Sequence, residues 1–350
     1  MLWWGLLAAA FAFDELGEGA RPTGRTIEPT ERFARADLLG QRVVTDPAAL
    51  GRVARDTASA LRSTSRTELV TPGVFGELGV TVDDVLRTLD LVARVADEDA
   101  GQPTQRLASH AFLLEHFDAW AWSPDTTAAA KRKVTVTPHK LRLTKYLVYQ
   151  VKGSREKTTT YTTALYASPD DPARLTAYTR MDAYAGIFEP GGAAHGLVEP
   201  LVYLTREGVN QALMQGTVEV ALTDGSTQLY NVHRNNGMAW NSSIKDPNKQ
   251  GRYWTFREVQ GVLGVEDIPL ADHVAVAGDI YNVGLGKLVA IVDDAGVLRL
   301  AVLADTGGAF QPNLFQLDWF AGAYPSHAAF AKGTAHLPVR ARAMVLVAKP

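Results

Sequence analysis

The feature of the sequence that most constrains the fold is a change of pattern after Ser123-Pro124-Asp125. Before it, apolar residues recur every three or four positions, as in ALGRVARDTASALRS and VDDVLRTLDLVARVA, a spacing typical of amphipathic helices. After it, the chain consists of short runs rich in Val, Thr, Tyr and Leu, such as KVTVTP, LRLTKYLVYQV and TTTYTTALY, which are typical of strands. A helical start followed by many short strands predicts an α+β chain, mainly β, with barrel-like β domains.

Short local patterns predict where several elements begin and turn. Asp46 before Pro47 indicates the start of one helix, and Thr81 with Asp84 indicates a capping box at the start of another. In TVEVALTDGSTQLYNV, alternating residues flank Asp224-Gly225, a dipeptide that accommodates the positive φ angles of a tight hairpin turn. A second hairpin is predicted in KLVAIVDDAGVLRLAVLAD and a final strand in ARAMVLVAK.

The bulk composition excludes several classes of function. At 350 residues the chain is long enough for two domains, because one hydrophobic core usually stops growing near ~250 to 300 residues. Its 35 basic and 38 acidic residues include no lysine or arginine block, so we expect no nucleic-acid partner. Without cysteine there is no disulfide, no Cys-ligated zinc and no lipid anchor on a cysteine.

The first residues resemble a signal peptide. MLWWGLLAAAFAF is apolar for about the length of a signal-peptide core, and Ala10-Phe11-Ala12 has the small-x-small form of a cleavage site. Residues 1–13 therefore predict export to the periplasm or the cell envelope. Since no Lys or Arg precedes the apolar run, a misassigned start or a buried N-terminal helix is the alternative.

Common cofactor and nucleophile motifs are absent from the sequence. The histidines are scattered and none is spaced as in H-E-x-x-H, so we expect no metal site and no cofactor. The glycines of GVFGELG and VGLGKL lack the strand-to-helix context and the GK[ST] ending of phosphate loops, which indicates turns. No G-x-S-x-G is present to form a serine nucleophile elbow.

One segment, VLADTGGAFQPNLFQLDWFAG, contains the most suggestive acidic residues. Asp305-Thr306-Gly307 after an apolar run is similar to the motif of aspartic proteases. Those enzymes need two carboxylates that share one proton, and the chain has no second D-[TS]-G. Gly308 also stands where such enzymes usually have Ser, Thr or Ala, and homodimeric proteases of this kind have much shorter subunits. An aspartic protease is therefore only a distant alternative.

The same segment as a whole resembles a different family. Asp305-Thr306-Gly307-Gly308-Ala309, a loop, then Leu317-Asp318-Trp319-Phe320 and Gly322 is similar to the "3D" signature of the MltA family of lytic murein transglycosylases. Upstream, Asp279 in VAVAGDIYNVGLGKLVAI stands at the place of the family's third aspartate. The three aspartates follow the family's order and approximate spacing.

Weaker matches lie in the same order along about residues 135 to 350. YTRMDAYAG resembles the family's [ST]-R-x-[ED]-I-x-x-G segment, and ALMQGTVEVALTDGSTQLYNVHRNNGMAW resembles its Q-G-S-G strand, D-G hairpin and N-G-x-x-Y run. LRLTKYLVYQ matches the family's L-x-x-T-G-Y-Y-x-P in Thr144 and Tyr146 only. The departures are Lys145 for Gly, Tyr149 for Pro, and Thr217-Val218 for the S-G of Q-G-S-G.

The resemblance implies a fold. We expect a double-psi β-barrel formed by residues 131–152 and 243–350, with a smaller β domain, residues 153–242, inserted between the two parts. Residues 14–130 would form a helical region packed on the barrel, and a groove would lie where the barrel meets the inserted domain.

The resemblance also implies an activity. The family cleaves the MurNAc to GlcNAc β-1,4 bond of peptidoglycan without water, and one carboxyl group performs both proton transfers to leave a 1,6-anhydroMurNAc end. This implies that Asp318 is the acid and then the base, while Asp305 orients it or binds backbone N–H groups. Burial beside Leu317 and Trp319 would favour the protonated form of Asp318. The implied substrate-binding residues are Thr144, Tyr146, Gln215, Asn236, Trp240 and Asp279.

Other interpretations stay open at the level of sequence. Asp318 could cap a turn, and Gln215, Asn236 and Trp240 could have ordinary hairpin and core roles. The main alternative function is a glycan-binding or wall-remodelling relative that kept the fold and lost turnover, because the groove motifs are degraded. In either case the expected partners are peptidoglycan glycan strands, and the protein is expected to be a monomer.

Overall fold

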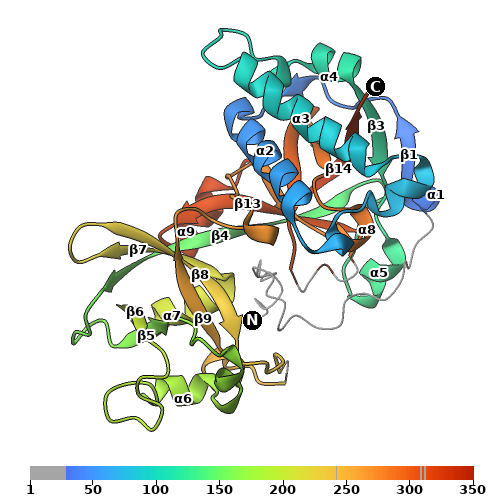
Figure 1. Ribbon diagram of the computed structural model, residues 1–350. Coiled ribbons are helices and arrows are strands. Elements are labelled where there is room, and N and C mark those ends of the chain that lie inside the picture. Colours follow the sequence, from blue (N-terminus) through green and yellow to red (C-terminus); the bar gives the residue numbers. More distant parts are fainter. Residues whose placement is uncertain (1–28, 242, 308–309, 311–312) are drawn as a thin grey trace.

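The computed structural model describes residues 29–241, 243–307, 310 and 313–350, and the predicted signal peptide, residues 1–13, lies outside them. Within this part of the chain the protein is a mixed α/β structure, mainly β, in which one 14-stranded sheet extends through the molecule. Figure 1 shows two bodies joined by the long strand β4 (Leu141–Ser154). The α+β class predicted from the sequence is confirmed.

The larger body is built around a closed ring of strands. Strand β4 pairs in parallel with β13 (Gln316–Tyr324), β13 pairs with β10 (Ala275–Ala277), and β10 pairs in parallel with β12 (Val297–Asp305). β12 forms the predicted hairpin with β11 (Leu288–Val292). β11 then pairs with β14 (Arg340–Ala348), the predicted final strand, and β14 pairs with the start of β4. This last pairing closes the barrel.

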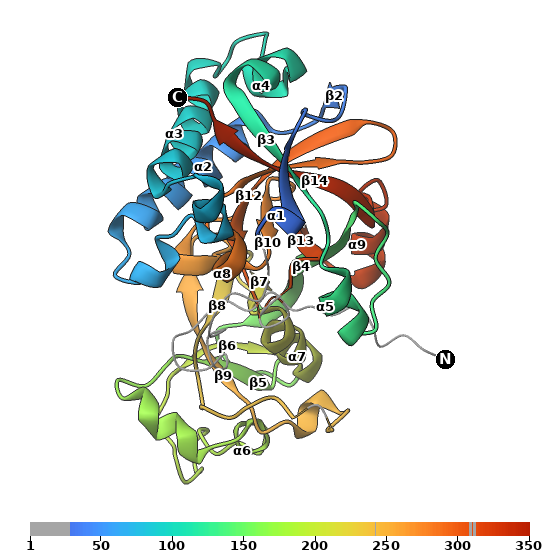
Figure 2. The ribbon, with the colours of Figure 1, turned by 90° about the vertical axis from the view of Figure 1, so that its right-hand side faces the viewer.

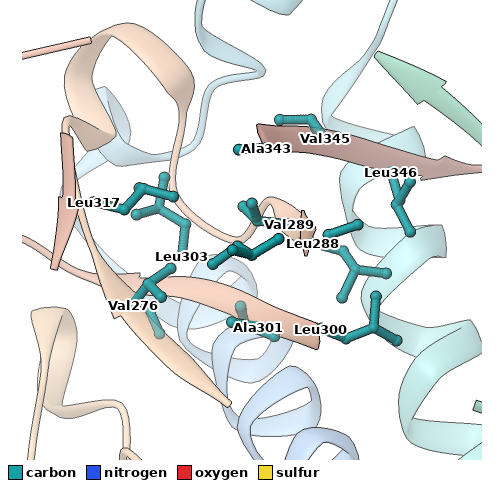
Figure 3. Close-up of a cluster of buried hydrophobic side chains, with 14 of the residues drawn as sticks. Val276, Leu288, Val289, Leu300, Ala301, Leu303, Leu317, Ala343, Val345 and Leu346 are labelled. Atoms are coloured by element: carbon teal, nitrogen blue, oxygen red, sulfur yellow. The ribbon is translucent and has the colours of Figure 1, made fainter. Parts of the chain in front are cut away.

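Apolar side chains fill the interior of this barrel. Figure 3 shows Val276, Val289, Leu303 and Leu317 in one cluster, and each of these residues comes from a different strand. All four are fully buried. Because burying one such side chain stabilises the folded state by roughly 1.5 to 3 kcal/mol, this cluster contributes substantially to the stability of the barrel.

The smaller body forms its own core around the second half of β4. Its strands are β5 (Thr163–Tyr166), β6 (Pro200–Leu204), β7 (Thr217–Leu222), β8 (Thr227–Asn235) and β9 (Trp254–Val259). β7 pairs in parallel with β4 and antiparallel with β8. The β7–β8 turn is the predicted Asp224-Gly225 hairpin, with Gly225 at φ +88°. A separate buried cluster that includes Leu204, Val220 and Phe256 holds this body together.

The two long N-terminal helices form as predicted. In α2 (Pro47–Ser63) the Asp46 carboxylate accepts a hydrogen bond from Ala49 N, and α3 (Val82–Glu98) begins with a reciprocal capping box between Thr81 and Asp84. Figures 1 and 2 show α2 and α3 side by side along the larger body, where α3 contacts β14 and α2 contacts β12. Their apolar stripes thus cover the outside of the barrel.

Three strands in the N-terminal segment were not anticipated. They are β1 (Phe33–Ala36), β2 (Arg42–Val43) and β3 (Phe117–Trp122). The helical interpretation of this segment is therefore incomplete, because β3 pairs along its length with β14 and β1 pairs with β3. The remaining α-helices are α1 (Pro29–Arg32), α4 (His110–His116), α5 (Thr126–Lys131), α6 (Arg180–Tyr184), α7 (Arg206–Gln215), α8 (Ile280–Val283) and α9 (His327–Gly333).

The two glycine-rich segments lie against each other. A Cβ atom on Gly73 would lie 2.4 Å from the carbonyl oxygen of Asn282, and one on Gly284 would lie 2.7 Å from Lys287 Nζ. Lys287 is buried beside them, with its ammonium 5.7 Å from the centre of the Phe75 ring and no hydrogen-bond partner in the described part of the chain. The glycines thus allow close backbone packing around a buried amine.

No helix in the described ranges, residues 29–241, 243–307, 310 and 313–350, combines the length and the apolar character needed to cross a membrane.

We predict that Lys287→Met stabilises the protein. Burial lowers the pKa of Lys287 from 10.5 to about 7, so the unfolded chain binds more protons between these two pH values. Stability therefore rises with pH across this window in the natural protein. At pH 7 the variant should have a free energy of unfolding higher by the order of 2 to 4 kcal/mol, measured by urea unfolding, and the difference should shrink toward pH 10.5.

The matched control is Lys332→Met, because Lys332 is an exposed lysine on α9. A pH dependence that is the same in the natural protein and in Lys287→Met would contradict the assignment of a buried neutral amine.

Candidate functional site

The structure brings Asp305 and Asp318 to the same face of the barrel sheet. Ala277 on β10 pairs on one side with Asp305 of β12 and on the other side with Asp318 of β13. Asp318 in turn pairs with Thr144 of β4. Side chains at directly paired positions point to the same face of a sheet. These pairings therefore place the carboxyl groups of Asp305 and Asp318 and the hydroxyl of Thr144 on one side of the sheet.

An irregularity in β12 is what turns Asp305 to this face. Val276 pairs with Leu303, but the next residue, Ala277, pairs with Asp305, so Ala304 has no partner on β10. Leu303 points into the apolar cluster of Figure 3. In a regular strand Asp305 would point the same way as Leu303, two residues earlier. The extra residue reverses this, as β-bulges beside functional sites commonly do.

Both oxygens of Asp305 accept hydrogen bonds. Tyr146, two residues beyond Thr144 on the same face of β4, donates its hydroxyl to Asp305 Oδ2 at 2.9 Å, and Thr306 N donates to Oδ1 at 2.9 Å. Burial raises the pKa of Asp305 to about 7, and the Thr306 N–H and the Tyr146 hydroxyl each lower it in part. Asp305 is thus a fixed carboxyl group that titrates near neutral pH.

Asp318 differs because its carboxyl group is free. It is 1% exposed, and neither of its oxygens has a hydrogen-bond partner among the described residues. The Thr144 hydroxyl is close enough to lower the pKa of Asp318, but it donates instead to Leu317 O at 3.4 Å and accepts from Gln316 Nε2 at 2.9 Å.

The surroundings of Asp318 favour its protonated form. Burial raises its pKa to about 8, the Thr144 hydroxyl lowers it, the charge of Asp305 raises it, and the Arg142 guanidinium lowers it. At pH 7 Asp318 is therefore mostly the neutral acid, with a proton that no neighbouring side chain has taken up. Chemically this is a proton donor at near-neutral pH.

The arrangement does not fit an aspartic protease. In that class two carboxyl groups lie close enough to share one proton. Here the oxygens of Asp305 bind Tyr146 and Thr306, while those of Asp318 have no partner within the part of the chain that the structure describes. The two groups influence each other by charge but are not joined by a hydrogen bond.

Asp279, the third aspartate, is buried and fully bonded. It caps α8, where its Oδ1 accepts from Asn282 N at 3.0 Å and its Oδ2 accepts from Asn282 Nδ2 at 2.7 Å. Oδ2 also accepts from Asn313 N at 2.9 Å, just before β13. Burial raises the pKa of Asp279, and these hydrogen bonds lower it in part. These contacts fix the start of β13, and hence Asp318, relative to β10.

The other predicted binding residues, Gln215, Asn236 and Trp240, lie in the smaller body. Gln215 ends α7 and is buried, and its Oε1 has no partner among the described residues. β7, which begins at Thr217 directly after this helix, pairs in parallel with β4 from Val218 and Tyr149 onward. Trp240 follows β8 and is 50% exposed.

Asn236 is occupied by contacts within the smaller body. Its Nδ2 donates to Tyr178 O at 2.8 Å and Gly251 O at 2.9 Å, and its Oδ1 accepts from Tyr253 N at 3.0 Å. These bonds join three segments and support a structural role for its amide. Gln215 keeps a buried amide oxygen without a partner among the described residues, and Trp240 presents an exposed ring.

Sequence reasoning missed Arg142. Its charge acts on Asp318, and it lies two residues before Thr144, on the same face of β4. The alternation Arg142, Thr144, Tyr146 within one strand could have identified it. No group of three or more acidic or histidine side chains in the described ranges is arranged to hold a metal ion.

Comparisons with known proteins bear on the fold. No protein-family profile matches the chain, and no curated protein sequence does. Among solved structures, a membrane-bound lytic murein transglycosylase from Agrobacterium tumefaciens has a TM-score of 0.60 at 17% identity and covers 87% of this chain and 93% of its own.

Two further structures agree. MltA from E. coli with bound chitohexaose has a TM-score of 0.59 at 16% identity, over 92% of this chain and 96% of its own. MltA from Neisseria gonorrhoeae has a TM-score of 0.57 at 15% identity, over 90% and 96%. The resemblance found in the sequence is confirmed at the level of the fold.

We predict that Asp318→Asn stabilises the protein at neutral and alkaline pH. The pKa of Asp318 is raised from 3.8 to about 8 on folding, so the folded protein binds more protons between these values and its stability falls as pH rises. Asparagine cannot ionise and escapes this loss. At pH 8 the variant's free energy of unfolding should be higher by on the order of 2 kcal/mol or more, and should approach the natural value near pH 4.

The control is Asp170→Asn, an exposed position. If Asp318→Asn follows the same pH dependence of unfolding as the natural protein, Asp318 is not held protonated by the fold.

Proposed function

We propose that this protein is a peptidoglycan lytic transglycosylase that cleaves the MurNAc to GlcNAc β-1,4 bond and leaves a 1,6-anhydroMurNAc end. The observation that carries the proposal is the state of Asp318. A buried, protonated and unpartnered carboxyl group lies on the barrel sheet of a chain that has the MltA fold. A reaction with one acid/base needs such a group and no second nucleophile.

In the proposed mechanism Asp318 acts twice. It first donates its proton to the glycosidic oxygen, and the GlcNAc leaving group departs from C1 of the MurNAc. The resulting carboxylate then takes the proton of the C6 hydroxyl of the same MurNAc, whose oxygen attacks C1 and closes the anhydro ring. Asp318 ends the cycle protonated, as it began. The burial that holds its pKa near 8 favours the first step, and its ionisation is transient.

Asp305 and Tyr146 act as positioning residues in this proposal. The Tyr146 hydroxyl and the Thr306 N–H hold the Asp305 carboxyl, whose charge raises the pKa of Asp318. Asp279 fixes the start of β13. Thr144, Gln215 and Trp240 are proposed to contact the glycan, and Asn236 to shape the loop that carries Trp240.

The closed ring of strands supports a double-psi barrel. The parallel pairs β4–β13 and β10–β12 lie among antiparallel neighbours, and the strands come from two separate parts of the chain. We assign residues 131–152 and 260–350 to this barrel and residues 153–259 to the inserted domain, because β9 pairs with β8 and packs in the core of the smaller body. Residues 29–130, the described part of the N-terminal segment, combine helices with three strands, and the pairing of β3 with β14 makes them an integral layer of the barrel body.

A glycan substrate is supported by the E. coli relative, which was solved with bound chitohexaose. We propose that the protein works as a monomer in the cell envelope, where peptidoglycan is found. The alternative is a glycan-binding relative without turnover, which the replaced positions Thr217-Val218 favour.

We predict that Asp318→Asn abolishes turnover. Purified protein incubated with murein sacculi should release muropeptides with 1,6-anhydro ends, detected by mass spectrometry. The variant should release them at least about a thousand-fold more slowly, because it can neither donate nor accept the proton. Its folded state is checked by the unfolding measurement described above.

Three outcomes would contradict the proposal in different ways. Ordinary reducing ends would indicate a hydrolase, and binding of sacculi without product would indicate the glycan-binding relative. Full activity of Asp318→Asn would refute the assignment of the acid but leave the activity standing.

A second prediction concerns Tyr146→Phe. When the Tyr146 hydroxyl is removed, the Asp305 carboxylate loses a hydrogen-bond donor and Asp305 stays protonated to higher pH. Because Asp305 is then less often charged, it raises the pKa of Asp318 less. The alkaline limb of the pH profile of kcat, which reports loss of the Asp318 proton, should move down by about half a unit to one unit.

The control is Tyr149→Phe, because Tyr149 lies on the opposite face of the same strand, in the core of the smaller body. An alkaline limb that moves equally in both variants would show that the effect is not transmitted through Asp305.

A further inference from the structure

A hollow of about 500 Å³ lies at the edge of the barrel, where β14 begins beside the start of β4. Its apolar wall includes Leu337, Pro338 and Val339, and the Val339 side chain is 66% exposed. Arg340 lines the same hollow and is exposed. The hollow thus combines an apolar surface with a cation.

The other charges in the hollow are paired. Asp294 lies 2.6 Å from Lys140 Nζ, and Asp293 lies 2.9 Å from the Arg299 guanidinium. Arg340 has no ion-pair partner in the part of the chain that the structure describes. Its positive charge is therefore the one in the hollow that is available for an anion.

The hollow lies close to Asp318 along the sheet. Arg340 pairs with Arg142 of β4, and Arg142 pairs with Gln316 of β13, two residues before Asp318. Asp318 is therefore displaced from Arg340 by two strands across the sheet and by two residues along the strand direction. This displacement corresponds to about 12 Å between the two Cα atoms. Arg142, between them, is near enough for its charge to act on Asp318.

The Arg340 side chain suits a carboxylate ligand. Its guanidinium matches the geometry of a carboxylate, and it stands beside the apolar wall of the hollow. The edge of the sheet near Asp318 therefore offers one site for an anion next to an apolar surface.

We propose that this hollow binds the peptide stem of peptidoglycan, with a stem carboxylate on Arg340 and the apolar stem side chains on Leu337 and Val339. This inference rests on the proposed function. The stem is attached to MurNAc, the sugar whose C1 reacts at Asp318, so it must leave the site nearby. Four residues of an extended peptide span up to about 13 to 14 Å, which is enough to cover the distance from Asp318 to Arg340.

The test compares two substrates that differ only in the stem. Soluble murein glycan strands are used as isolated, with stems, and after an amidase has removed the stems. The KM of anhydro-end formation is measured for both with the natural protein, with Arg340→Gln and Arg340→Glu, and with Arg52→Gln, an exposed arginine on α2, as the matched control. Direct binding of both strand types is measured in the Asp318→Asn background.

The natural protein and Arg52→Gln should have a lower KM for strands with stems. In Arg340→Gln the preference, taken as the ratio of the two KM values, should fall about five-fold, and Arg340→Glu should reverse it. No preference in the natural protein, or an equal change on both strand types, would overturn the proposal. If no anhydro product forms at all, the proposed function fails, whereas the binding ratio in Asp318→Asn still decides whether the hollow recognises a stem.

Discussion

The site depends on one short strand. β10 has three residues, and it lies between β12 and β13, so that Ala277 has an aspartate on each side. Because neighbouring strands are about 4.8 Å apart, this spacing keeps the two carboxyl groups near enough to interact by charge but too far apart to share a proton. The small side chain of Ala277 leaves room between them. The bulge at Ala304 changes the direction of the Asp305 side chain, so that the carboxyl groups of Asp305 and Asp318 lie on the same face of the sheet.

This arrangement is costly for the folded state. Asp318 and Lys287 are both buried without a hydrogen-bond partner among the residues that the structure describes, and burial shifts the pKa of each toward its neutral form. A buried polar group without a partner destabilises a fold by roughly 1 to 3 kcal/mol. The apolar core of the barrel offsets this. Of these two buried groups, Asp318 has a role in the proposed reaction, because the desolvation that destabilises the fold also keeps Asp318 protonated.

Local signals in the sequence predicted the parts of the structure that local contacts determine. The Asp46 cap, the Thr81 capping box and the Asp224-Gly225 hairpin each depend on residues within a few positions of one another. The strand β3 was missed because its pairing with β14 joins residues more than 200 positions apart. The bulge at Ala304 and the Tyr146 to Asp305 hydrogen bond depend on long-range register in the same way. The resemblance identified the aspartates, but only the structure distinguishes the bonded Asp305 from the free Asp318.

The degraded motif LRLTKYLVYQ shows how alternation along a strand bears on the site. Thr144 and Tyr146, the two residues that match the family pattern, lie on the face of β4 that carries Asp318. Lys145 and Tyr149, the two departures, have the opposite parity and point to the other face. Lys145 pairs with Trp319, and Tyr149 packs in the core of the smaller body. The departures in this strand therefore leave the surroundings of Asp318 intact, which supports the enzyme over a relative that has lost its catalytic group.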